Sequence, residues 1–164
     1  MAVSILHEIM VRFAAKVGIG ESVVADDAGG YTFAIDDITV SFAERAETGE
    51  LITVAEVGEL PDEGREYVYR LLLEAMFRDG GTGGAIFSLE PDSKRIWAHR
   101  RDSLATMDDE SFGSMLERFV NGMEEWRRIV GGLNGLAPDL AKAEQTSVRE
   151  SRDMSLSPDG FMRV

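Results

Sequence analysis

The apolar residues of this chain switch between a helical and a strand period as the sequence proceeds, and this alternation limits the folds it can adopt. Between residues 4 and 17 the spacing is four, three and four, which predicts one apolar stripe along a helix that Ser4 can cap. Gly18 and Gly20 predict the end of this helix after Lys16. The stripe consists of Leu6, Met10, Phe13 and Val17, widened by Ile5 and Ile9.

The next forty residues follow a period of two, which is typical of half-buried strands. Three runs are separated by Asp, Glu and Gly residues, whose short side chains and flexible backbone suit tight turns. Short connections predict antiparallel pairing. The runs are Tyr31, Phe33 and Ile35, then Ile38, Val40 and Phe42, then Ile52 and Val54.

A second helix is predicted after Pro61, and it is more apolar than one buried face requires. Its first face carries Val68, Leu71, Leu72, Ala75 and Met76 at helical spacing. A second apolar column consists of Tyr69, Leu73 and Phe77 at every fourth position. This column fits either a second buried face or an interface with another protein.

A second hairpin and a third helix complete the predicted elements. Segments 85–90 and 95–101 flank a turn at Pro91, and a helix after residues 106–109 is expected to end at Gly131-Gly132. We therefore expect an α+β fold with one domain over residues 1–136, in which a twisted antiparallel sheet packs against helices. Residues 137–164 lack a sustained apolar period and are expected to form a flexible C-terminal tail.

Composition excludes several classes of function. The chain has no cysteine, two histidines and a formal net charge of −13, which disfavours thiol chemistry, metal binding and nucleic-acid or anionic-lipid partners. No apolar stretch is long enough for membrane insertion, and the N-terminus lacks the pattern of a signal peptide. We expect a cytoplasmic protein that binds other proteins and needs no cofactor.

Alternative chemical readings of individual residues are weaker. The glycine run at residues 80–84 follows a helix and precedes a strand, whereas a phosphate-binding loop requires the reverse order. Paired aspartates lie at expected turns or helix starts, where they accept hydrogen bonds from the backbone. Neither His7 nor His99 has a neighbour in sequence that would orient a base, and the basic residues around Trp97 lie in an acidic chain. No catalytic or metal site is predicted.

The order of elements and several segments resemble the CesT-like (Tir chaperone family) class I chaperones of type III secretion, over about residues 5–133. The segments that carry the resemblance are Asp26-Asp27-Ala28-Gly29-Gly30, Gly58-Glu59-Leu60-Pro61, Leu71-Leu72-Leu73-Glu74-Ala75, Phe87-Ser88-Leu89-Glu90-Pro91-Asp92, and Leu116-Glu117-Arg118-Phe119 with Trp126. The chain departs from the family at Met76, where many relatives carry asparagine. The tail after Leu136 has no counterpart in the family.

The resemblance implies an α-β-β-β-α-β-β-α subunit in a homodimer of the bacterial cytoplasm, without enzymatic activity. The implied partners are the N-terminal segment of a secreted effector protein and, as a further partner, the secretion ATPase. A dimeric protein-interaction module outside type III secretion is the alternative, and a carboxylate hydrolase ranks last because the acidic pairs lie on separate turns.

Two sets of apolar residues are expected to form the binding surfaces. Not every member can be exposed, since some must fill the core. The expected effector-binding residues are Ile5, Ile9, Phe13, Val40, Phe42, Ile52 and Val54. The expected dimer-interface residues are Tyr69, Leu73, Met76, Phe77, Ile96 and Trp97.

Overall fold

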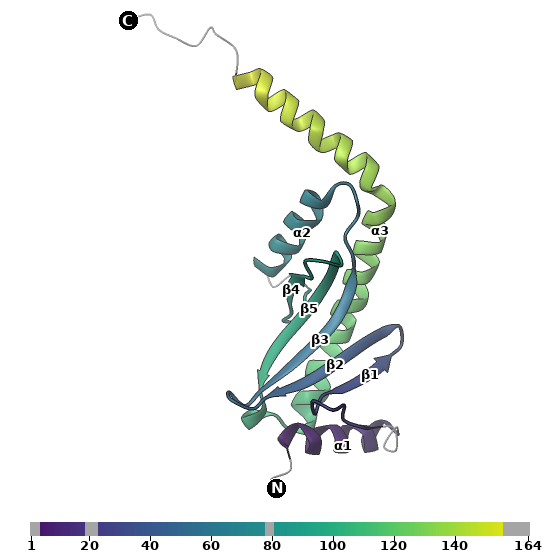
Figure 1. The fold of residues 1–164 in the computed structure, drawn as a ribbon, viewed down its shortest axis with the longest axis vertical. Coiled ribbons are helices and arrows are strands. Elements are labelled where there is room, and N and C mark those ends of the chain that lie inside the picture. The colour runs from purple at the N-terminus through teal and green to yellow at the C-terminus, as the bar shows by residue number, and fades with distance from the viewer. Residues whose placement is uncertain (1–3, 19–22, 78–80, 156–164) are drawn as a thin grey trace, which may run out of the picture.

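The computed structural model describes residues 4–18, 23–77 and 81–155, with the side chains of residues 134, 137, 138 and 140–155 left out of the description. The described residues form one antiparallel sheet, and helices precede, interrupt and follow its strands along the chain (Figure 1). Its elements, in chain order, are α1 (Ile5–Val17), β1 (Tyr31–Ile35), β2 (Ile38–Arg45), β3 (Glu50–Glu59), α2 (Arg65–Phe77), β4 (Ile86–Leu89), β5 (Arg95–Ser103), the 3-10 helix η2 (Leu104–Thr106) and α3 (Asp109–Ser155). This order confirms the expected α+β class.

The sheet has the strand order β1-β2-β3-β5-β4, so β1 and β4 are its edge strands. All neighbouring strands are antiparallel, with Phe33 opposite Val40 and Phe42 opposite Thr53. A β-bulge between Glu56 and Gly58 interrupts the register of β3 with β5. At Gly58 an added Cβ would lie 3.1 Å from Val130, so the bulge brings the strand backbone close to α3.

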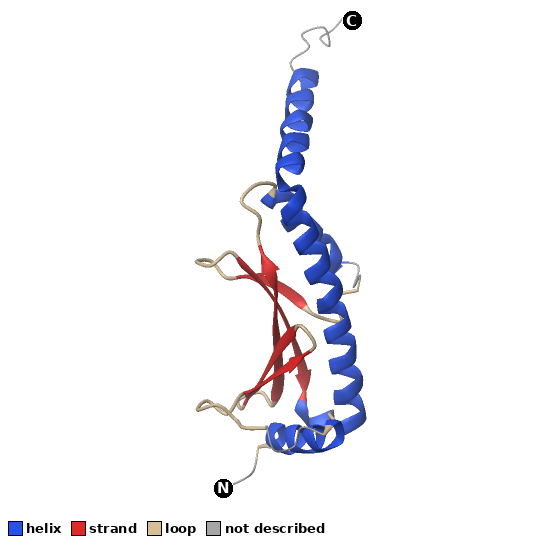
Figure 2. Cartoon of the chain, turned by 90° about the vertical axis from the view of Figure 1, so that its right-hand side faces the viewer, coloured by secondary structure: helices blue, strands red, loops and turns tan. Residues whose placement is uncertain are grey.

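The helices cover one face of the sheet, and α3 runs along its length (Figure 2). One hydrophobic core fills the space between this face and the helices, and Phe42, Phe112 and Phe119 are among its largest fully buried side chains. The residues that alternate with the core positions of β3 are only half-buried, because no described helix lies on the opposite face. We call this opposite side the open face of the sheet.

The third helix is much longer than expected. It continues through Gly131, Gly132 and Pro138 to Ser155 and projects beyond the sheet (Figure 1). The prediction that Gly131-Gly132 ends the helix is wrong, because neither glycine adopts the positive φ of a helix-ending residue and Leu133 still packs against the core. The flexibility expected of residues 137–164 stays a prediction, and residues 156–164 lie outside the described ranges.

The glycine run between α2 and β4 packs directly on α3. An added Cβ at Gly83 would lie 2.7 Å from the backbone oxygen of Arg118, and one at Gly122 would lie 3.1 Å from the backbone oxygen of Gly81. Arg100 also donates to the Gly83 carbonyl while it pairs with Asp102. The described part of this run is therefore a packed connector.

Candidate protein-binding surfaces

An open groove of about 440 Å³ lies between α1, the edge strand β1 and α3. The apolar part of its lining comes from all three elements and includes Phe13, Phe33, Leu116 and Val120. Phe13 makes edge-on aromatic contacts with Phe33 and Phe112, at ring-centroid distances of 6.2 and 5.2 Å. These contacts fix the position of α1 against the sheet and α3. We call this cavity the β1 groove.

Both ends of α1 are capped, which sets where the helix lies beside the groove. The Ser4 hydroxyl accepts a hydrogen bond from the His7 backbone N–H, and Gly18 closes the other end in the left-handed conformation. The His7 ring Nδ1 lies 2.6 Å from the hydroxyl of Tyr31, which joins α1 to β1. Burial raises the pKa of the Tyr31 hydroxyl.

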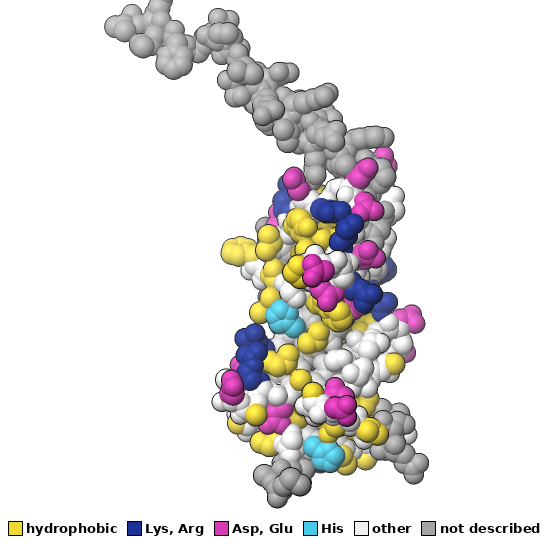
Figure 3. All heavy atoms as spheres, viewed as in Figure 1, with side chains coloured by type: hydrophobic (Ala, Val, Ile, Leu, Met, Phe, Trp, Pro, Cys, Tyr) yellow, Lys and Arg dark blue, Asp and Glu magenta, His cyan; other side chains and the backbone are white. Residues whose placement is uncertain are grey.

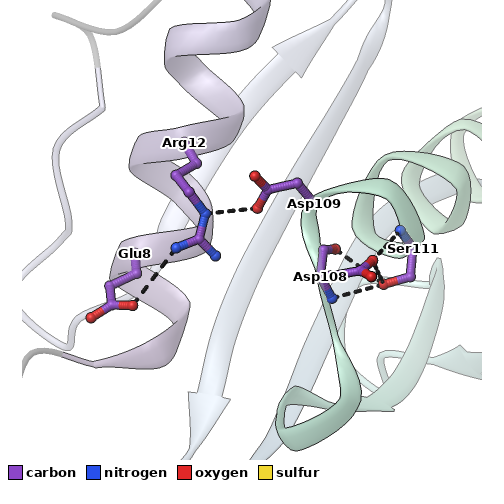
Figure 4. A network of polar contacts seen from close by, with 5 residues as sticks. All are labelled: Glu8, Arg12, Asp108, Asp109 and Ser111. Carbon is purple, nitrogen blue, oxygen red and sulfur yellow. Dashed lines mark hydrogen bonds and ion pairs between the residues drawn. The ribbon is translucent and has the colours of Figure 1, made fainter.

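A polar network joins α1 to the start of α3 (Figure 4). Arg12 donates to Asp109 at 2.7 Å and also pairs with Glu8, and the hydrogen bond to Asp109 is the main cause of its raised pKa. Asp108 accepts hydrogen bonds from both the backbone N–H and the hydroxyl of Ser111, which lower its pKa. These bonds cap the first turn of α3 and fix the angle between the two helices.

A second apolar cavity, of about 200 Å³, lies between α2 and the strands β4 and β5. Its lining contains four of the six expected dimer-interface residues: Tyr69, Leu73, Met76 and Ile96. Leu73 is 63% exposed and Phe77 is 89% exposed, so this side of α2 is uncovered in the single subunit. Figure 3 shows hydrophobic side chains gathered over α2 and the neighbouring sheet. We call this surface the α2 surface.

Two of the six expected dimer residues, Ile96 and Trp97, belong to β5 and do not project with α2. Ile96 is only 1% exposed and belongs to the core, although its side chain borders the cavity. Trp97 is half-buried and alternates with Ile96, so it lies on the open face of the sheet. Both residues were predicted to lie in the dimer interface, but the alternation of side chains along β5 places them on opposite faces of the sheet.

The expected effector-binding residues fall into four different places. Ile9, Val40 and Phe42 are at most 1% exposed and fill the core, so they offer no surface to a partner. Ile52 and Val54 lie half-buried on the open face of the sheet, whereas Phe42 lies on the face that packs against the helices. Ile5 is exposed on α1, and of the seven residues only Phe13 lines the β1 groove.

The groove includes residues that sequence reasoning did not assign to it. Leu116 and Val120 come from α3 and Phe33 comes from β1, and all three were expected only as parts of amphipathic elements. Gly113 also lines the groove, and a Cβ added there would meet no atom within 4 Å. The sequence signal for this open space was Gly113 itself, a helical position without a side chain. It became informative only once the structure placed β1 beside α3.

The other polar features of the described residues do not form a chemical site. His99 reaches only Ser88, at 3.4 Å, and Arg100 pairs with Asp102 inside the fold. No group of three or more His, Asp or Glu residues in the described ranges is arranged to hold a metal ion. None of the helices in these ranges has the length and apolar character needed to cross a bilayer.

Comparison with known proteins agrees with this architecture. The model of the Tir chaperone protein (CesT) family matches residues 8–127. A protein of Chlamydia pneumoniae is 26% identical over 129 residues, which cover 77% of this chain and 96% of that protein. Among solved structures, the ExsC-ExsE complex has a TM-score of 0.66 at 20% identity and covers 79% of this chain and 97% of that one.

A further structure is the Yersinia pestis type III secretion chaperone SycH in complex with a stable fragment of YscM2. It has a TM-score of 0.56 at 20% identity and covers 73% of this chain and 97% of the matched chain. At these identities the two solved structures show a shared fold. Each match includes nearly all of the solved chain but only part of the present one.

Proposed function

The chain belongs to the Tir chaperone protein (CesT) family, and from this premise we propose that it holds the N-terminal region of a secreted effector protein in an extended form. It is a chaperone of the type III secretion class, and it acts in the bacterial cytoplasm before export. Holding the segment uses binding energy alone, and no covalent bond is made or broken. The secretion ATPase as a further partner stays a prediction.

The β1 groove is the observation that supports this role. An extended segment can pair its backbone with the free edge of β1 while its side chains enter the apolar lining. Phe13 and Phe33 meet there, so the groove combines main-chain pairing with apolar anchoring. A segment bound in this way is kept from aggregating through its own apolar residues. We therefore propose that the effector site is centred on Phe13 in this groove.

The sharpest test of the groove fills it without removing any existing contact. Gly113→Leu places an apolar side chain in the open space of the groove, and a helical glycine replaced by leucine should stabilise α3 by about 0.5–1 kcal/mol. Gly132→Leu is the matched control, because Gly132 also lies in α3, has no atom within 4 Å of an added Cβ and does not line the groove.

Each variant would be co-expressed with the N-terminal region of a secreted protein encoded beside it, and the complex would be purified. We expect Gly113→Leu to lose the complex while it folds normally, and Gly132→Leu to retain it. Hydrogen exchange of the wild-type complex should show added protection in β1. Full capture by Gly113→Leu would place the effector elsewhere.

We also propose that two subunits associate through the α2 surface. Leu73 and Phe77 expose large apolar side chains there, beside the cavity that α2 forms with β4 and β5. A patch of this kind is more typical of an interface than of a solvent-exposed helix. A two-fold axis would bring the same patch of each subunit together. The β1 groove is lined by the opposite edge strand and would stay open in such a dimer.

A further inference from the structure

The charges around the β1 groove define the class of segment that fits it. The apolar part of the lining is bordered by three exposed carboxylates, Asp36 at the end of β1 and Glu117 and Glu124 on α3. No lysine or arginine is among the residues that line the groove. An apolar groove with a rim of one charge selects for a partner with the opposite charge at its flanks.

These three carboxylates form no ion pair with any described residue, unlike many other acids of the chain. Asp109, Asp62 and Glu56 each form an ion pair with an arginine or a lysine. For Asp36, Glu117 and Glu124 the described residues provide no ion pair or side-chain hydrogen bond. The rim therefore keeps its negative charge available to a partner.

Two arginines of the helices that form the groove make their polar contacts outside its lining. Arg12 of α1 pairs with Glu8 and Asp109, away from the groove lining. Arg127 donates to the backbone oxygen of Asp37. The whole chain adds to the same field, since its formal net charge is −13.

The spacing of the two glutamates sets a distance between the charges of the partner. Glu117 and Glu124 are seven positions apart on α3, which corresponds to two turns and a rise of about 10 Å. In an extended segment, side chains on one side recur about every 6.6 Å. Basic residues two or four positions apart can therefore reach both glutamates, because lysine and arginine side chains are long and flexible.

We propose that the occupant of the β1 groove is an extended segment of a secreted protein whose apolar residues are flanked by lysine or arginine, two or four positions apart. This inference rests on the function proposed above and specifies the partner of that same groove. A second copy of this acidic chain fits poorly there, because its own charge would oppose the rim. Nucleic acid and anionic membranes are disfavoured for the same reason.

The test uses a charge-neutral rim and a control with the same total charge. The rim variant combines Asp36→Asn, Glu117→Gln and Glu124→Gln, and asparagine tolerates the positive φ of residue 36. The control variant combines Glu47→Gln, Glu63→Gln and Asp92→Asn, which are exposed and do not line the groove. Each variant removes three negative charges from the full chain.

The probes are three labelled peptides with one apolar centre and flanks of lysine, glutamine or glutamate, titrated by fluorescence anisotropy. For the wild type and the control variant we expect the lysine peptide to bind most tightly and the glutamate peptide most weakly. The rim variant should bind the lysine peptide about tenfold more weakly, since three exposed charge pairs each contribute modestly. Added salt should weaken binding of the lysine peptide to the wild type, but it should hardly change binding of this peptide to the rim variant.

Equal affinities of the three peptides for the wild type would overturn the inference, as would an unchanged preference in the rim variant. Absence of lysine-peptide binding up to about 1 mM would also overturn it. The same variants in the co-purification experiment separate this inference from the proposed function. Capture that is lost in Gly113→Leu but unchanged in the rim variant refutes the charge preference alone, whereas failure of the wild type to capture any effector segment refutes the function.

Discussion

Truncation of the two most exposed side chains of α2 should separate the proposed dimer without unfolding the subunit. The double variant Leu73→Ala and Phe77→Ala removes side chains that are 63% and 89% exposed, so little intramolecular packing is lost. Both substitutions keep the helical propensity of α2 or raise it. Any large effect must then arise from contacts between subunits.

The size of the effect follows from the buried area. A leucine or phenylalanine that becomes fully buried contributes about 1.5–3 kcal/mol, and a conservative figure for partial burial is about 1 kcal/mol per side chain. A symmetric dimer contains each residue twice, which gives about 4 kcal/mol in total. Because about 1.4 kcal/mol corresponds to a factor of ten, the dissociation constant should rise roughly a thousandfold.

Sedimentation velocity over a concentration series measures this constant directly, and circular dichroism at a dilution where both proteins are monomeric checks the fold. Val24→Ala is the matched control, because Val24 is 78% exposed and lies outside α2. A double variant with the dimerisation constant of the wild type would refute the α2 surface as the interface. A wild type that stays monomeric throughout the series would refute the dimer itself.

Two further predictions concern the subunit. Thr53 is fully buried and its hydroxyl has no hydrogen-bond partner within the described structure, so Thr53→Val should leave stability unchanged or raise it by about 1 kcal/mol, as measured by urea unfolding; a marked loss would show that the hydroxyl is satisfied. The pKa of Asp108 lies below its ordinary value of 3.8 in the folded state because Ser111 donates hydrogen bonds to it. Its contribution to stability is therefore present above pH 3.8 and is lost as the pH falls through the folded pKa. Asp108→Ala should lower the thermal midpoint at neutral pH, and the gap to the wild type should narrow in acid; a gap that is constant with pH would contradict this assignment.

The elements were predictable because their apolar periods are long and their turns carry polar residues. The run at 31–35 became β1 with the expected residues inward, and the four-three spacing of the third helix placed Phe112 and Phe119 in the core. The helix end at Gly131-Gly132 was not predictable from glycine content alone. A glycine ends a helix when the chain adopts a positive φ, and here packing of Leu133 against the core continues the helix instead.

The binding surfaces were less predictable, because a period tells which residues share a face but not what covers that face. Ile9 and Phe13 share the stripe of α1, yet Ile9 enters the core and Phe13 reaches the β1 groove. Val40 and Val54 both belong to strands of alternating pattern, and they lie on opposite faces of the sheet. The column on α2 was better defined, since its residues exceed what one helix face can bury.

The contact between the glycine run and α3 has a mechanical consequence for the two proposed surfaces. Gly122 supports the connector that leads from α2 to β4, and its neighbours Val120 and Glu124 line the β1 groove. The connector lies against the α3 backbone without an intervening side chain that could adjust. If this turn of α3 shifts when a segment enters the groove, the connector should therefore move with it. Binding beside the edge strand β1 would then change the position of the connector that leads to the other edge strand, β4.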